Sequence, residues 1–99
     1  AYDNLSGTNQ VHRAILRMLD PVDFEDFLRD LGGAYARLGQ NGMASLLTSE
    51  RYALLGRPKD ASLHAKRALG LLKRGSPGWQ RAQDVLLASE NADTQRRKK

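Results

Sequence analysis

The chain has 99 residues, of which 40% are apolar and 6% aromatic, and this size allows one small domain with a single core of about four or five helices. It contains no cysteine, which excludes disulfides and thiolate metal sites, and no apolar run approaches the ~20 residues of a membrane-spanning helix. The formal net charge is +5 at pH 7, with −3 in residues 1–50, +4 in residues 51–95 and +4 in the last four residues.

The first half of the sequence predicts two helices after an irregular start. Residues 1–7 are polar and begin without Met or a basic, apolar leader, which indicates a processed chain or an excised fragment. Apolar residues recur at helical spacing within 8–20, which predicts the first helix. Asp20-Pro21 then ends that helix and caps the next, predicted over 21–38 and ended by a glycine.

The second half predicts three more helices. They run over residues 42–55, 58–74 and 77–91, and each begins or ends at a glycine or a proline. Turns of about three to five residues join them, so neighbouring helices should be antiparallel. We therefore expect an all-α fold of about five helices, with a helical domain over 8–92 and a disordered basic tail over 93–99.

An internal repeat lies in the middle of the chain. The sequence Tyr-Ala-Arg-Leu-Gly at 35–39 is echoed by Tyr-Ala-Leu-Leu-Gly at 52–56, a spacing of 17 residues that equals one helix plus its turn. A pair of helices should then repeat every 34 residues. Trp79 lies 34 residues after Ser45 and marks the predicted start of the next repeat.

These residues resemble the tetratricopeptide repeat, which has a Tyr near the end of its first helix, a Gly at the turn and three Ala on its second helix. Alanines at a helix crossing let two backbones approach, and a Tyr ring fills the wedge beside them. Ser45 and Ser49 depart from the pattern, since a large aromatic residue and Gly are usual there. The alternative is an ordinary antiparallel helical bundle. The residues that define the repeat are Tyr52, Gly56, Ala61, Ala65, Ala68 and Trp79.

A narrower resemblance covers residues 28–87. The segments 42–46, 64–68 and 75–86 resemble the C-terminal repeat region of bacterial periplasmic zinc metallopeptidases of the HExxH type, related to the outer-membrane β-barrel-assembly-enhancing protease. The resemblance implies a periplasmic location and a parent protein whose separate catalytic domain holds zinc. This chain would then be the part that binds substrates or partners, such as the parent's own catalytic domain or an outer-membrane assembly complex.

The sequence itself predicts no catalytic or metal site. An HExxH zinc site needs two His one helical turn apart with a Glu between them, whereas His12 and His64, the only histidines, lie 52 residues apart. The cluster Asp23, Glu25 and Asp26 lies early in a predicted helix, where carboxylates complement the macrodipole. We expect a chain that is not an enzyme and that binds neither a cofactor nor a metal.

Repeat geometry predicts where a protein or peptide partner would bind. First helices of stacked pairs line the concave surface, and here they would begin near Thr8, Gly42 and Ser76. An equally strong alternative places Met43 and Leu46 in the core. The residues predicted to face the groove are His12, Leu16, Met43, Leu46, Glu50, Gln80 and Asp84.

Two other functions are compatible with the sequence. Residues 66–99 are rich in Lys and Arg and would suit a basic adaptor for RNA or an anionic membrane, although no aromatic residues accompany the charges as in base stacking. A solvated face is the simpler interpretation, so nucleic acid is not favoured. Self-association is the second alternative, because a few repeats leave apolar ends uncovered.

Overall fold

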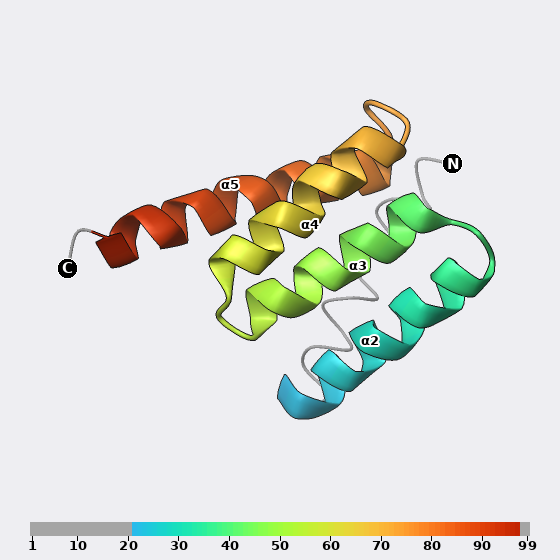
Figure 1. Cartoon of the computed structure of the whole chain (residues 1–99), viewed down its shortest axis with the longest axis horizontal. Helices are drawn as coiled ribbons and strands as arrows, with labels where there is room; N and C mark the ends of the chain where they lie inside the picture. The colour runs from blue at the N-terminus through green and yellow to red at the C-terminus, as the bar shows by residue number, and fades with distance from the viewer. Residues whose placement is uncertain (1–20, 98–99) are drawn as a thin grey trace.

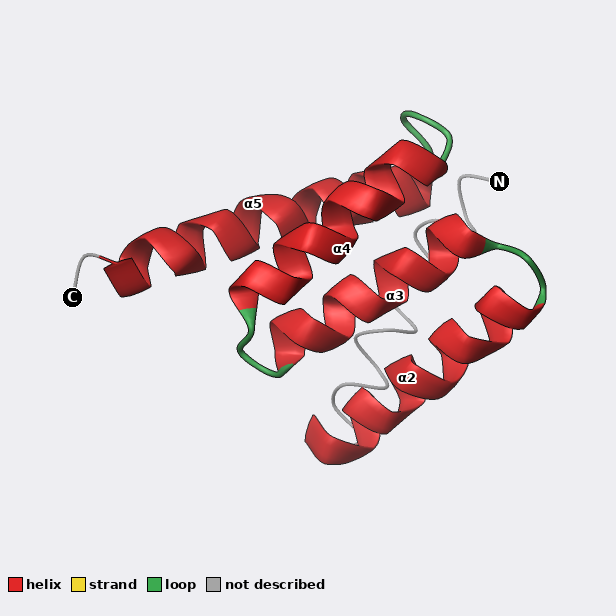
Figure 2. Ribbon diagram, in the orientation of Figure 1, coloured by secondary structure: helices red, strands yellow, loops and turns green. Residues whose placement is uncertain are grey.

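The fold is all-helical in the part of the chain that the structure describes. The computed structural model describes the backbone of residues 21–97 and the side chains of residues 23–96. Four helices and no strand occur in this range (Figures 1 and 2). The helix predicted over 8–20 lies outside it, so the expected count of five is not tested. The helices are α2 (Pro21–Arg37), α3 (Asn41–Leu54), α4 (Pro58–Leu71) and α5 (Pro77–Arg97).

The repeated Tyr-Ala-x-Leu-Gly sequence forms the same helix end twice. Gly39 and Gly56 have φ of 77° and 73°, a backbone conformation that glycine adopts without a side-chain clash. After α2, the N–H of Gln40 donates to the carbonyl of Tyr35 at 2.9 Å, and after α3 the N–H of Arg57 donates to that of Tyr52 at 3.0 Å. Each is the 6→1 hydrogen bond of a Schellman cap, so the 17-residue echo is a repeated stop signal.

Helix α3 lies at the centre and packs against the three other described helices (Figure 1). Two adjacent leucines on α3 pack against different neighbouring helices. Leu47 belongs to a cluster with Phe24 and Leu28 of α2. Leu46 belongs to a second cluster with Ala68 of α4 and Ala82 of α5. In the described part of the chain the core therefore consists of two small clusters joined through α3.

Small residues set the spacing between α3, α4 and α5. Ala61, Ala65 and Ala68 of α4 are fully buried, as the alanine pattern predicts for a close helix crossing. Gly42 is equally tight, because a Cβ built on it would lie 2.8 Å from Cδ2 and 2.9 Å from Cγ of Leu72. Leu72 can occupy this place because it leaves the helix in an extended conformation, with ψ of 152°.

Two glycines give a matched test of this packing. Gly42→Ala is expected to destabilise the fold by about 1–3 kcal/mol, because the added methyl group overpacks the Leu72 contact. Gly70 lies at an exposed position of α4, and no atom lies within 4 Å of the place where a Cβ would be. Gly70→Ala should therefore stabilise the fold by about 0.4–1 kcal/mol. Urea unfolding of both variants measures the two changes in the free energy of unfolding. Equal changes would contradict the tight contact between Gly42 and Leu72.

Two predicted helix ends are wrong. The helix predicted to reach residue 74 ends at Leu71, because Leu72 turns its side chain toward Gly42 and Gly78. The last helix does not fade at Asn91 but continues to Arg97, so 93–97 is helical where a disordered tail was predicted. No Gly or Pro follows Gly78 to interrupt it.

Candidate functional site

Three hollows of the described surface gather where α5 overhangs the turn between α3 and α4. Helix α5 has 21 residues and antiparallel α4 has 14, so the C-terminal end of α5 extends past that turn (Figure 1). Three hollows are lined in part by Pro58, the first residue of α4. We call the two larger ones, of about 490 and 410 Å³, the overhang notch.

One side of the overhang notch is apolar. Its small side chains come from three elements: Ala53 from the end of α3, Pro58 from the start of α4, and Ala88 and Ala92 from one face of α5. Positions 88 and 92 are one helical turn apart and therefore lie one above the other. Arg96, a further turn along, lines the hollow with them. These small side chains leave an open apolar hollow between the three helices.

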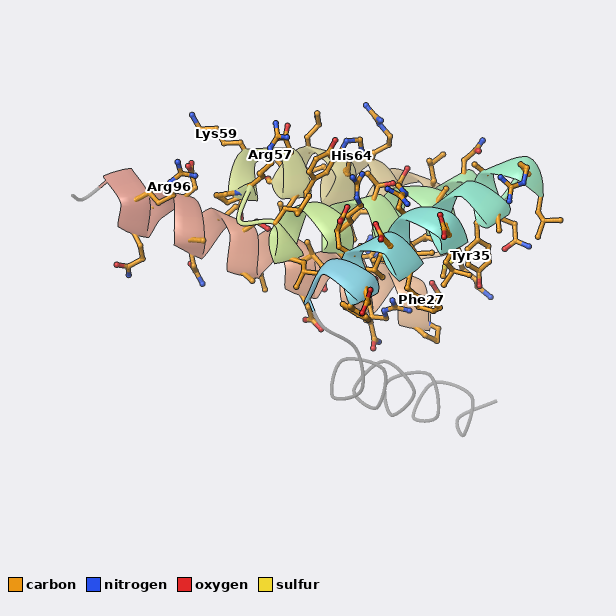
Figure 3. All side chains as sticks on the ribbon, turned by 90° about the horizontal axis from the view of Figure 1, so that it is seen from below. Phe27, Tyr35, Arg57, Lys59, His64 and Arg96 are labelled. Atoms are coloured by element: carbon orange, nitrogen blue, oxygen red, sulfur yellow. The ribbon has the colours of Figure 1, made fainter. Side chains whose placement is uncertain are left out.

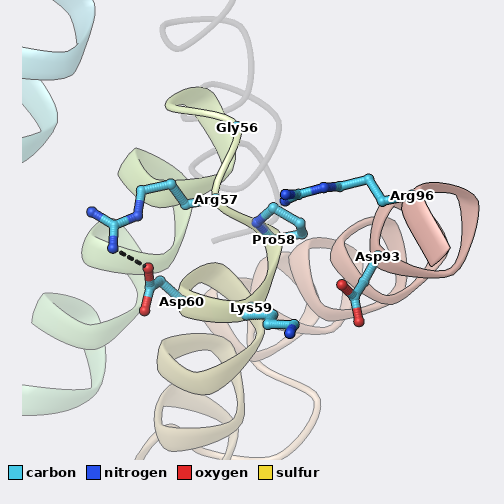
Figure 4. Close-up of a pocket in the computed structure, with 7 residues that line it drawn as sticks. All are labelled: Gly56, Arg57, Pro58, Lys59, Asp60, Asp93 and Arg96. Atoms are coloured by element: carbon cyan, nitrogen blue, oxygen red, sulfur yellow. Dashed lines mark ion pairs between the residues drawn. The ribbon is translucent and has the colours of Figure 1, made fainter.

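The other side of the overhang notch is charged. Arg57 donates to Asp60 at 2.7 Å across the first turn of α4 (Figure 4). Arg96 reaches from α5 toward Pro58, and Lys59 lies on the same side, near Asp93 (Figure 4). Neither Lys59 nor Arg96 has an ion-pair partner among the described residues. Lys59 and Arg96 thus lie beside the apolar side of the notch, in a hollow that Asp93 also lines.

An aromatic stack joins α3 to α4 beside the notch. The rings of Tyr52 and His64 are stacked at 5.3 Å between centroids, and the Arg57 guanidinium lies 5.3 Å from the Tyr52 centroid. Burial, together with the charge of Arg67, lowers the pKa of His64 below its usual value of 6.5, although Asp60 opposes the shift. The imidazole is therefore mainly neutral at pH 7, and it packs on the Tyr52 ring. The Tyr52 ring holds the Arg57 guanidinium against its face.

The described residues that were predicted to face a groove differ in burial. Leu46 is 0% exposed and belongs to the core, so its predicted groove position is wrong, and the alternative interpretation holds for it. Met43 is half-buried and packs against the same cluster. His12 and Leu16 lie outside the described residues.

The remaining groove residues have separate roles. Glu50 accepts two hydrogen bonds from Arg81, at 2.6 and 3.2 Å, which ties α3 to α5. Gln80 is exposed, and its side-chain N–H donates to the carbonyl of Gly75 at 3.4 Å. Asp84 is exposed on α5. Of the predicted set, Glu50 lies between helices but is already paired, and a partner would have to compete for it.

Potential metal ligands do not gather in the described part of the chain. Between residues 23 and 96, no three His, Cys, Asp or Glu side chains come together as a metal site would require. The acidic cluster at the start of α2 is divided, since Glu25 pairs with Arg51 at 2.6 Å and Asp26 pairs with Arg29 at 3.4 Å. None of the described helices combines the length and apolar character of a membrane span.

The comparisons with known proteins add no assignment. No protein-family model, no curated protein and no solved structure matches this chain. The functional assignment therefore rests on the site alone. Sequence reasoning missed the overhang notch, although two signals pointed to it: the spacing of Ala88, Ala92 and Arg96, and the lack of a helix breaker after Gly78.

Proposed function

We propose that this chain is a non-catalytic protein-interaction module whose overhang notch binds a short segment of a protein partner. The observation that carries the proposal is the pairing of an alanine-lined hollow with Lys59 and Arg96, two cations without ion-pair partners among the described residues. Such a hollow suits an apolar side chain next to a carboxylate, from Asp, Glu or a chain terminus. The carboxylate of the partner segment would provide specificity, and its apolar side chain, buried in the hollow, would provide affinity.

We further propose that the helices are tetratricopeptide-like hairpins. The repeated Schellman caps and the buried alanines of α4 support this proposal. So does the position of α5, which packs on α4 and also contacts α3, as the first helix of a following repeat would. Trp79 near the start of α5 is half-buried, and its backbone N–H donates to Ser76 Oγ at 3.3 Å.

The resemblance to periplasmic zinc metallopeptidases suggests a parent protein for this chain. We propose that the chain is the partner-binding end of a larger protein whose catalytic domain holds the zinc. The full-length gene product tests the idea directly. An upstream HExxH helix preceded by a signal peptide is the expected result, and the lack of both would overturn the parent assignment while leaving the overhang notch proposal intact.

Selection from a random peptide library tests the overhang notch. Selected peptides are expected to carry an apolar residue next to an acidic residue or a free C-terminal carboxylate. Ala92→Trp fills the apolar side of the notch and should weaken binding of the selected peptides by more than about tenfold. Fluorescence anisotropy of labelled peptides measures this change.

The control places the same large side chain elsewhere. Ala36→Trp at an exposed position of α2 keeps the helix and should leave peptide affinity unchanged. Replacing the acidic residue of a selected peptide by its amide should cost about as much affinity as Arg96→Gln. Peptides that lack an acid, or that bind Ala92→Trp as tightly as the unmodified protein, would rule the notch out as the binding site.

A further inference from the structure

The outer face of α4 is a continuous basic ridge that begins at Lys59 and runs away from the overhang notch. Its members are exposed, they lie along α4 or in the turn after it, and they include no acid. Figure 3 places Lys59 and His64 on the side of the molecule opposite Phe27 and Tyr35. We call this surface the α4 ridge. It consists of Lys59, Leu63, Lys66, Arg67, Leu71, Lys73 and Arg74.

Helix geometry explains why these side chains share one face. Positions 59, 63, 66, 67 and 71 follow the three- and four-residue spacing of a single helical stripe. The alanines at 61, 65 and 68 fall on the opposite stripe and are fully buried. The packing of α4 against its neighbours therefore forces the ridge outward, into solvent.

The charge of the α4 ridge is not neutralised within the described part of the molecule. Asp60 is the one acidic residue of α4, and it pairs with Arg57 at 2.7 Å. None of the five Lys and Arg residues of the ridge has an ion-pair partner among the described residues. Other arginines are paired, as Arg29, Arg51 and Arg81 show. The ridge is thus an uncompensated band of positive charge.

Two leucines interrupt this charged band. Leu63 is 53% exposed and Leu71 is 56% exposed, so a large apolar surface stands among the cations. They lie eight residues apart, about two turns of the helix. Gly70 lies between them in the sequence and has no atom within 4 Å of the place where a Cβ would be. The solvent-facing side of the ridge therefore combines positive charges with exposed apolar side chains.

We propose that the α4 ridge docks the protein onto an anionic phospholipid bilayer. Lys and Arg residues near a membrane surface are attracted to acidic headgroups, and leucines of an interfacial helix enter the boundary between headgroups and acyl chains. Exposed leucines offer little to a phosphate backbone, and no aromatic residue of the ridge is available for stacking on bases. The bilayer is the surface that uses both the charges and the leucines.

Vesicle binding tests this proposal with the full 99-residue chain. It should sediment with equimolar phosphatidylglycerol and phosphatidylcholine vesicles, but not with phosphatidylcholine alone. Lys66→Gln/Arg67→Gln should weaken binding by about 10- to 30-fold, since each Lys or Arg near an anionic membrane surface contributes about fivefold in affinity. Leu63→Ser/Leu71→Ser should remove the part of the binding that survives high salt.

The controls remove the same charge from other places. Arg29→Gln/Arg37→Gln on α2 and Lys98→Gln/Lys99→Gln at the chain end should each change vesicle binding by less than about threefold. Equal losses in all three double variants would overturn the proposal in favour of a general charge effect. It would also be overturned if a duplex DNA oligonucleotide bound more tightly than the vesicles and lost affinity with Lys66→Gln/Arg67→Gln. Peptide binding at the overhang notch should persist in each of these ridge variants, so the two proposals fail separately.

Discussion

Replacing Leu46 with Ala is expected to lower the free energy of unfolding by about 2–5 kcal/mol, the largest single effect we predict for this chain. Leu46 is fully buried and lies where α3, α4 and α5 meet, against Ala68 and Ala82. Ala68 and Ala82 are small and fixed in helices, whereas the partly buried Met43, Leu69 and Leu72 around them can close over part of the space that the missing atoms leave. The cost should therefore lie within that range. Urea unfolding followed by circular dichroism measures it.

An exposed leucine provides the control for this measurement. Leu38 is 72% exposed in the turn after α2, and Leu38→Ala should change stability by less than about 0.5 kcal/mol. The peptide affinity of folded Leu46→Ala, measured well below its melting temperature, should be unchanged. A stable Leu46→Ala variant with weaker peptide binding would return Leu46 to a binding surface and contradict the core assignment.

The sequence was sufficient for the starts of the four described helices and for the ends of α2 and α3. Pro58 and Pro77 begin helices, and Gly39 and Gly56 end them with left-handed backbone. These signals act within a few residues and need no tertiary contact. The ends of α4 and α5 are the exceptions. Leu72 leaves the helix to pack beside Gly42, thirty positions earlier in the chain, which no local pattern could indicate.

The candidate site was harder to predict because it depends on relative helix lengths and rotations. The alanines of α4 were correctly expected at a close crossing, since small residues at helical spacing let two helix backbones approach. Leu46 and Leu47 are adjacent and equally apolar, so their sequence could not say which side of α3 faces α2 and which faces α5. To predict the overhang notch, one must know that α5 extends past the end of α4. The only sequence signal for this is the lack of a Gly or Pro after Gly78, and the absence of a helix breaker predicts a helix end less well than its presence.

Breaking the ion pair between Glu50 and Arg81 should give the second largest effect. The two side chains are only 19% and 13% exposed, and the guanidinium binds both carboxylate oxygens. Arg81→Gln leaves a largely buried carboxylate without this partner and should cost about 2–4 kcal/mol, somewhat below the loss for a fully buried pair. Glu50→Gln should cost less, because the amide still accepts a hydrogen bond from Arg81.

A double-mutant cycle separates the pair from its surroundings. Combining Glu50→Gln with Arg81→Gln should cost less than the sum of the single losses, with a coupling energy of about 1–3 kcal/mol. The pair of Arg57 and Asp60 is the matched control. Its side chains are 60% and 37% exposed, and its coupling should not exceed about 1 kcal/mol and should fall with salt. Equal coupling in the two pairs would mean that water reaches Glu50 and Arg81 as freely as the surface pair. In that case the ion pair would contribute little to holding α5 on α3, and Glu50 would become available to a partner.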